Sequence, residues 1–570
     1  MTTIKPTDES IKIILENIHR GRWVIPNFQR DFTWTTNQVK ELLESILQSY
    51  YIGAVLVWKC RNNKNALLAV EPVYGTGLSP DALDTESIIL DGQQRLTSIY
   101  YAKYSPDKPL KLTKSPYVFF IELDKIINNN YDDFVFAANK NDNWTKNILA
   151  NQAKQFQEKY FPINKLDDYH RWLEDFKEHL EDVEKKTRDA ARLEIKIIRE
   201  HLEILDKDYR IAVIELPENM RFDHVCEIFE RINSKGTTLT VFDLLNARLL
   251  KGGIELRRKL WGSIEKDNQS IISRFAKDNS RFPILILQIL SLNRKSSCKR
   301  RDLIELTPDN FIKDWNNAVE LTKQTLKIIT NHRNIQLSFG VIKRNYLPYQ
   351  TMIPILAVLL KENKNQKNIP ASSIKISRWY WASVFTNKYA GSTDSQIAKD
   401  YRQMKEWFKD ESKEIETIKD AKQSFKLNLQ DETRTGSAVY KGVLSLIVLK
   451  GANDFSTGNP PEYHKLNDHH IFPKGQVNNI TLDSKDDINS ILNRTLISED
   501  TNLKGELKKL PRKYLKTIEL KIGKQALLKI LETHFINAKC YDYLLNNNFR
   551  EFIKERARLI EYEIRKKIDI

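Results

Sequence analysis

The stretch NDHHIFPKGQ (residues 467–476), followed by NRTLISEDTN (residues 493–502), holds the most specific chemistry in this sequence. Asn493 follows His470 by 23 positions (493 minus 470) and precedes Asn502 by 9 (502 minus 493). Phosphodiester hydrolysis uses a hard divalent cation to neutralise charge on the phosphate, and neutral imidazole and amide oxygen can hold such a cation. A second imidazole can take the proton from the attacking water near neutral pH. The stretch therefore predicts a metal-dependent nuclease centre in which one histidine binds and the next acts as the base.

This pattern resembles the HNH, or ββα-metal, nucleases, and the resemblance implies a role for each residue. His470, directly before Ile-Phe-Pro, corresponds to the general base, and His469 to a metal ligand. Asn493 corresponds to the residue that pins the loop, and Asn502 to a metal ligand on the closing helix. Many members carry a carboxylate where His469 stands, so Asp468 is the alternative ligand. The implied metal is Mg²⁺ or Mn²⁺. Two adjacent histidines alone are more often an ordinary surface pair, and the spaced asparagines favour the nuclease interpretation.

Basic residues follow the motif closely. Residues 504–524 hold eight lysines and arginines against two glutamates. Phosphate contacts supply most sequence-independent affinity for nucleic acid, so this local excess favours DNA binding. Lys504 and Lys513 are the expected backbone contacts, together with Arg434 upstream of the motif.

Composition sets the broad class of the protein. The chain has 570 residues, is 41% hydrophobic and 29% charged, and carries a net charge of +16, which suits a soluble protein of several domains with an anionic partner. Its four cysteines form no CxxC pair, which argues against a disulfide framework and a zinc ribbon. No signal peptide is visible, and the longest apolar runs, 282–292 and 352–360, are too short to span a bilayer. We expect a cytoplasmic protein with no membrane partner.

Two N-terminal motifs combine anion-binding groups with turns. IPNFQRDFTW (residues 25–34) contains Gln29 and Arg30, and the arginine could clamp a phosphate bidentately. The alternative is a packed aromatic loop with an exposed arginine. In SIILDGQQR (residues 87–95) an apolar strand is followed by a glycine turn and the start of a helix, where free backbone N–H groups attract anions. An ordinary strand-to-helix junction has the same pattern.

These motifs, together with FERINSKGTTLTVFDLLNA (residues 229–247), resemble the N-terminal domain of the GmrSD-type modification-dependent restriction endonucleases. The resemblance implies a fold similar to the ParB nucleotide-binding domain and binding of an NTP whose identity stays open. It assigns nucleotide contact to Gln29, Arg30, Asp91, Gly92, Gln93, Gln94, Arg95, Asn233 and Gly236. For the last two residues the alternative is a plain helix–turn–helix hairpin in which the glycine caps the first helix.

The domain organisation follows from these motifs and from hydrophobic periodicity. We expect a multidomain, mainly α protein with α+β parts. Residues 8–252 form the ParB-like domain, with strands at SPYVFFIEL and YRIAVIELP and a helical insertion at about 131–208. Residues 253–430 form an all-α linker, and residues 431–570 the HNH domain. The aromatic run at 379–381 reads as core, although aromatic faces can also stack on bases.

Together these features predict a type IV-like endonuclease of bacterial defence, which senses modified phage or other foreign DNA under the control of a nucleotide. One alternative is a nucleotide-dependent DNA-binding regulator with an inactive HNH domain, and another is an RNA-cleaving toxin. With one nuclease motif per chain, cutting both strands requires a homodimer or sequential nicking.

Overall fold

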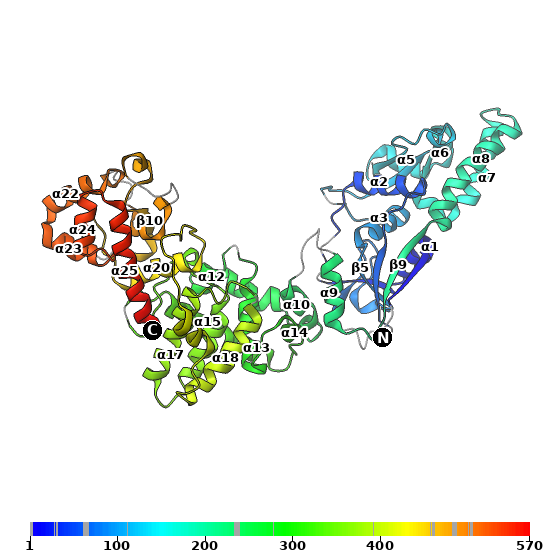
Figure 1. Ribbon diagram of the computed structural model, residues 1–570. Coiled ribbons are helices and arrows are strands. Elements are labelled where there is room, and N and C mark those ends of the chain that lie inside the picture. The colour runs from blue at the N-terminus through cyan, green and yellow to red at the C-terminus, as the bar shows by residue number, and fades with distance from the viewer. Residues whose placement is uncertain are drawn as a thin grey trace. The chain divides into compact units, whose positions relative to one another are not determined.

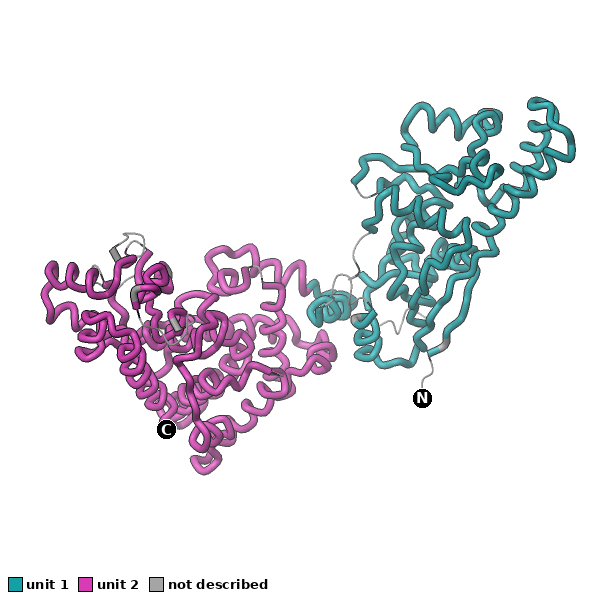
Figure 2. Tube along the Cα trace, turned by 45° about the horizontal axis from the view of Figure 1, so that its top comes forward, with its two compact units in different colours: residues 1–255 teal, residues 256–570 magenta. Residues whose placement is uncertain are grey.

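The computed structural model describes residues 4–27, 29, 32–60, 68–110, 112–232, 240–277, 279–333, 335–391, 393–455, 458, 462–480, 487–499, 501 and 506–570. The chain divides into two compact units, residues 1–255 and 256–570 (Figure 2). Helices dominate both units and the sheets are small, so the expectation of a multidomain, mainly α protein is confirmed. None of the described helices is long and apolar enough to cross a membrane.

Unit 1 is built on a six-stranded mixed sheet with the order β1-β9-β3-β5-β2-β4 (Figure 1). The strands are β1 (Lys5–Ser10), β9 (Arg210–Leu216), β3 (Val55–Lys59), β5 (Ser87–Asp91), β2 (Trp23–Pro26) and β4 (Val70–Glu71). The central strands β3 and β5 are buried along most of their length, which explains their continuous apolar sequences.

Three helices close around this sheet. Helix α1 (Ile11–His19) buries Ile11, Ile14, Leu15 and Ile18, the one-face spacing seen in the sequence. Helix α2 (Thr36–Leu47) begins with a capping box between Thr35 and Gln38. Helix α3 (Gln93–Tyr104) follows β5 after the single residue Gly92.

The segment 131–208 differs from the helical insertion indicated by its sequence. Helices α7 (Tyr169–Asp182) and α8 (Arg188–Glu203) are present, as the charge pattern predicts. The segment also contributes strands β7 (Val135–Asn139) and β8 (Tyr160–Pro162), which pair with the two sides of β6 (Tyr117–Glu122). Strands of three to five residues are too short to show a clear alternation of apolar and polar residues in the sequence. These two strands are stabilised by their pairing with β6, which the local sequence does not reveal. Shorter helices α4 (Leu123–Ile127), α5 (Asn143–Ala150) and α6 (Gln152–Glu158) complete this part.

Helices α9 (Phe222–Ile232) and α10 (Val241–Lys251) end unit 1. Unit 2 begins with a helical array: α11 (Gly262–Lys266), α12 (Ile271–Ala276), α13 (Phe282–Lys295), α14 (Arg300–Ile304), α15 (Phe311–Ile329), α16 (Met352–Asn363), α17 (Ile369–Phe385), α18 (Thr393–Lys409), α19 (Glu416–Ser424) and α20 (Ala438–Leu449). Trp379, Tyr380 and Trp381 on α17 are at most 1% exposed, so they belong to the core and offer no stacking face.

A two-stranded hairpin lies within the C-terminal part of unit 2. Strand β10 (Leu466–His470) pairs with β11 (Arg494–Ser498) in antiparallel register. Helices α22 (Pro511–Ile522), α23 (Lys524–Glu532), α24 (Ala538–Leu545) and α25 (Phe549–Ile568) follow. In Figure 1 these helices gather beside β10, and α20 approaches it from the helical array.

Candidate functional site

The register of the hairpin decides which motif side chains share a face. His470 pairs with Arg494, and His469 pairs with Thr495. Because successive strand residues point to opposite faces, Asp468 and His470 lie on one face and His469 on the other. The ladder continues as far as His470, so the two histidines are separated by ordinary strand alternation.

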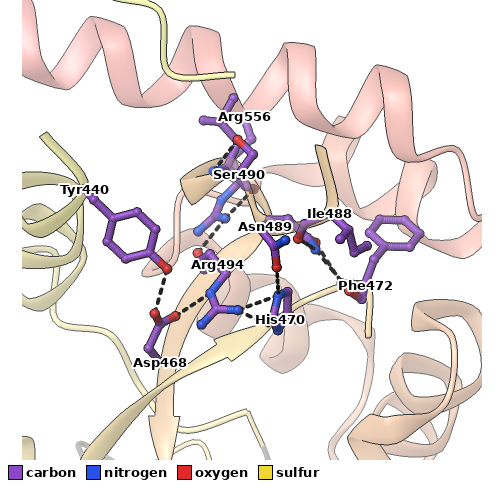
Figure 3. A network of polar contacts seen from close by, with 11 residues as sticks. Tyr440, Asp468, His470, Phe472, Ile488, Asn489, Ser490, Arg494 and Arg556 are labelled. Atoms are coloured by element: carbon purple, nitrogen blue, oxygen red, sulfur yellow. Dashed lines mark hydrogen bonds and ion pairs between the residues drawn. The ribbon is translucent and has the colours of Figure 1, made fainter. Parts of the chain in front are cut away.

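Arg494 joins Asp468 and His470 on the shared face (Figure 3). Its Nε donates to Asp468 Oδ1 at 2.8 Å, and the hydroxyl of Tyr440 on α20 donates to Asp468 Oδ2 at 2.6 Å. The Asp468 and Arg494 side chains are only 15% and 13% exposed. Both carboxylate oxygens are therefore engaged, and the aspartate charge is compensated by a neighbouring cation.

The imidazole of His470 is held from two sides. Its Nε2 lies 3.2 Å from Asn489 Oδ1. Arg494 Nη1 lies 2.6 Å from Nδ1 and 2.5 Å from Nε2, so the guanidinium lies against both ring nitrogens and these contacts favour neither tautomer. Burial and the positive charge of Arg494 lower the pKa of His470 to about 4. The imidazole is therefore neutral at neutral pH and can accept a proton.

Asn493 ties down the chain that leaves β10. It is fully buried, and its carbonyl accepts from Ile471 N at 2.8 Å. Its side-chain oxygen accepts from Phe472 N at 2.8 Å, while Nδ2 donates to Phe472 O at 3.0 Å and to Ile488 O at 2.8 Å. These bonds fix the turn that follows His470, which is the geometry that the loop-pinning role requires.

Arg556 on α25 stabilises the backbone of the hairpin around the start of β11. This residue is fully buried, and its guanidinium donates to Leu492 O at 2.6 Å, Arg494 O at 2.8 Å and His534 O at 3.0 Å. Burial lowers the pKa of Arg556 to about 10. The guanidinium thus binds the carbonyl oxygens of Leu492 just before β11, of Arg494 at its first residue, and of His534 after α23. It fixes the backbone from which the Arg494 side chain projects.

In unit 1 the DGQQR residues lie at the junction of β5 and α3. Arg95 Nη1 donates to Ile52 O at 2.7 Å, and Nη2 donates to Ala54 O at 2.8 Å and contacts Asp91 at 3.3 Å. Gly92 has φ +93°, and a Cβ there would lie 2.8 Å from a Val55 methyl group. The motif is a braced junction in which the arginine holds the backbone before β3.

The other motif of unit 1 contacts the same junction. Gln29 Nε2 donates to Ile89 O at 3.0 Å and to Leu90 O at 2.8 Å. Gln94 Oε1 accepts from the backbone N–H of Thr33 at 2.8 Å. The two segments that the sequence analysis assigned to one nucleotide site are therefore brought together.

Comparison with known proteins agrees with this arrangement. The family model described as "GmrSD restriction endonuclease, N-terminal domain" matches residues 11–250. Uncharacterized protein MJ0686 of Methanocaldococcus jannaschii is 32% identical, and the match covers 96% of each chain. The residues that match the family model lie within unit 1, so the interpretation of the hairpin depends on the residues of unit 2.

Several predicted residues lie outside the described residues: Arg30, Asn233, Gly236, Asn502 and Lys504. Among the others, Arg434 and Lys513 are exposed, Gln93 is buried, and His469 is half-buried on its own face of β10. Among the described residues, no group of three or more histidine, cysteine, aspartate and glutamate side chains could hold a metal.

The sequence analysis missed four residues of this candidate site: Tyr440, Asn489, Arg494 and Arg556. Arg494 had a usable signal, because it directly follows Asn493 and is the one charged residue of strand β11. The other three act through partners distant in sequence, and nothing in their local sequence marks them.

Proposed function

We propose that this protein is a nucleotide-regulated DNA endonuclease whose HNH-type centre is the β10–β11 hairpin of unit 2. The observation that carries the proposal is the neutral His470 imidazole, which is oriented by Asn489 at the end of a strand whose exit is fixed by Asn493. A group that is positioned and neutral near pH 7 suits a general base. The similarity of residues 11–250 to the N-terminal domain of the GmrSD restriction endonucleases supports a restriction-type role and DNA as the substrate.

The His470 imidazole takes the proton from the water that attacks the phosphorus. Without substrate, Arg494 Nη1 contacts both ring nitrogens, Nδ1 at 2.6 Å and Nε2 at 2.5 Å. A phosphate oxygen is a stronger acceptor for a guanidinium than a neutral imidazole is. The scissile phosphate therefore draws Arg494 Nη1 to itself and leaves the imidazole open to the water.

The contacts of Asp468 bear on the first metal ligand. Both Asp468 oxygens are engaged by Arg494 and Tyr440, which favours His469 as the first ligand. The second ligand in this proposal is Asn502, as the resemblance to the HNH pattern implies. Imidazole nitrogen and amide oxygen are suitable donors for a divalent ion such as Mn²⁺ or Mg²⁺. When bound, the metal neutralises charge that develops on the phosphate and the leaving oxygen.

Unit 1 is the proposed control element, in which an NTP binds beside the β5–α3 junction and modified foreign DNA is sensed. Two observations support this: the glycine turn opens directly into α3, and the Gln29 and Gln94 segments converge on it. A strand, a tight turn and a helix N-terminus together favour a bound anion.

The test is a cleavage panel with the full-length protein. Plasmids with different base or backbone modifications are incubated with Mg²⁺ or Mn²⁺ and each NTP, and nicked and linear products are quantified. We expect nicking of at least one modified DNA, and a loss of about 100-fold or more for His470→Ala. His224→Ala, at an exposed histidine of unit 1, is the control and should cut normally. Equal cutting by His470→Ala would remove the assigned base.

The same panel separates the metal ligands and the rival functions. His469→Ala should raise the metal concentration needed for half-maximal cutting, whereas Asp468→Asn should leave that concentration unchanged and lower the maximal rate through Arg494. The opposite pattern would assign the metal to Asp468. Cleavage of RNA and not DNA would indicate the toxin alternative, and binding without any cleavage would indicate the regulator.

A further inference from the structure

A polar cavity opens beside the hairpin, within unit 2. It has a volume of about 590 Å³ and is lined by Asp468, by residues 344–350 of the helical array except Tyr349, and by Thr435, Gly436, Tyr440 and Lys441 around the start of α20. Asp468 and Tyr440 belong to the network around His470 (Figure 3). The cavity therefore shares two lining residues with the network that holds His470.

Segment 343–350 is fastened to the hairpin and to α20. Lys343 Nζ donates to Leu466 O at 3.1 Å, at the first residue of β10, and Lys441 Nζ donates to Leu347 O at 3.3 Å. These bonds fix the walls of the cavity relative to the motif strand. The helical array thus contributes directly to the surface around the proposed nuclease centre.

The charges in this cavity are unbalanced. Among the described residues, no carboxylate lies within ion-pair distance of Arg344 or Lys441. Both residues are partly buried, and they donate to neutral carbonyl oxygens, Arg344 to Lys277 O and Lys441 to Leu347 O. The one acid in the lining, Asp468, is already paired with Arg494 at 2.8 Å. Partly burying a cation without a counterion is unfavourable, because desolvation is not offset by an opposite charge. Two such cations in one polar cavity indicate a site for an anion.

The start of α20 faces the same space. This helix has 12 residues and is capped by Ser437, whose side chain accepts from Tyr440 N. Thr435 and Gly436, just before the cap, line the cavity and are exposed. The positive end of the helix dipole adds to the attraction of the two cations for an anion.

We propose that this cavity is a phosphate subsite that holds the backbone of the substrate strand next to the phosphate cleaved at His470. The inference rests on the proposed nuclease function. Inorganic phosphate and free nucleotides share the same chemistry, and the continuity of the cavity with the His470 network favours the DNA strand. The helical array then serves as part of the DNA-binding surface, in addition to connecting the two ends of the chain.

The sharpest test uses Gly436, because nothing lies within 4 Å of a Cβ added there. Gly436→Asp places a carboxylate at the edge of the subsite, and Gly436→Asn is the neutral control of the same shape. Binding of a short DNA duplex to the full-length protein is measured by fluorescence anisotropy in EDTA at several salt concentrations. We expect Gly436→Asp to weaken binding about tenfold and Gly436→Asn to leave it near wild type.

Lys441→Gln gives an independent measurement. Loss of one phosphate contact should make the negative slope of log affinity against log salt concentration shallower by about 0.9. Lys450→Gln, at the other end of α20, is the control and should keep the wild-type slope. Equal affinities of the two Gly436 variants, or an unchanged slope for Lys441→Gln, would overturn the subsite.

Two further arms separate the possible failures. If inorganic phosphate or an NTP binds in a Lys441-dependent manner while the DNA slope stays unchanged, the site takes a free phosphate and the strand assignment is wrong. If wild-type protein cuts DNA and His470→Ala does not, but all the subsite variants bind like wild type, only the subsite fails. Absence of binding and cutting by the wild type would reject the nuclease function itself.

Discussion

His470 and His534 are both held neutral near the hairpin, by different surroundings. His470 is half-buried beside Arg494, and burial together with the positive charge of Arg494 lowers the pKa of His470 to about 4. His534 is fully buried, with Nδ1 2.6 Å from Thr495 Oγ1 and Nε2 2.7 Å from Asn453 O. Burial lowers the pKa of His534 to about 4 as well. Both residues therefore take up a proton more readily in the unfolded chain.

This difference predicts an acid-sensitive unit 2. A histidine whose folded pKa lies below its unfolded value of about 6.5 stabilises the fold fully above that value, and the stability falls as the pH drops toward 4. Each histidine contributes up to about 1.4 kcal/mol per pH unit in this window. Denaturant unfolding at a series of pH values should show the fall, and His534→Gln should lessen its slope. An identical slope in the variant would contradict the account.

For single residues, the sequence indicated which side chains matter better than it indicated which other side chains they contact. The spacing from His470 to Asn493 was sufficient to expect a pinned turn, and the turn is pinned by three side-chain bonds. It could not indicate that Tyr440 and Arg494 engage Asp468, because those contacts depend on the hairpin register and on the approach of α20. These contacts of Asp468 are the reason why the proposal takes His469 as the metal ligand.

Among the elements, α25 has the strongest effect on the hairpin. Arg556 on this helix binds three backbone carbonyl oxygens, two of them at the start of β11. Arg556→Met keeps the apolar stem but leaves these buried acceptors without their donor. Since each buried unsatisfied group costs about 1–3 kcal/mol, we expect a loss of at least about 3 kcal/mol in the free energy of unfolding of unit 2.

Arg558→Met is the matched control on the same helix. The Arg558 side chain is 65% exposed and pairs with Glu555, so its removal should cost at most about 1 kcal/mol. Thermal or denaturant unfolding of the full-length variants would compare them. Similar losses for the two variants would mean that Arg556 does not support the hairpin in this way.

The sequence predicted a helix or strand correctly where the residues of that element alone carry the pattern. Helix α8 has neither glycine nor proline and is dense in charged residues, and α1 shows a one-face apolar pattern, so both were expected. Strands β7 and β8 were not, because their three to five residues become a sheet only through pairing with β6. Local patterns predicted the long helices and missed the short paired strands.

For the whole molecule, the division into residues 1–255 and 256–570 predicts two separable unfolding transitions. Arg95 braces the backbone before β3 in unit 1, and Arg556 braces β11 in unit 2. Arg95→Met should lower the melting temperature of one calorimetric transition only, and Arg556→Met that of the other only. If either variant shifts both transitions equally, the two units do not unfold independently.

The contact between Arg556 and β11 also has a consequence for how the protein is made. Ribosomes synthesise chains from the N-terminus, and domains generally fold in that order. Helix α25 therefore emerges after unit 1 and after both hairpin strands, and until then the carbonyl oxygen of Arg494 lacks its bond from Arg556. A nascent or prematurely terminated chain would carry unit 1 but an incompletely supported hairpin, so the proposed nuclease would become active only once translation is complete.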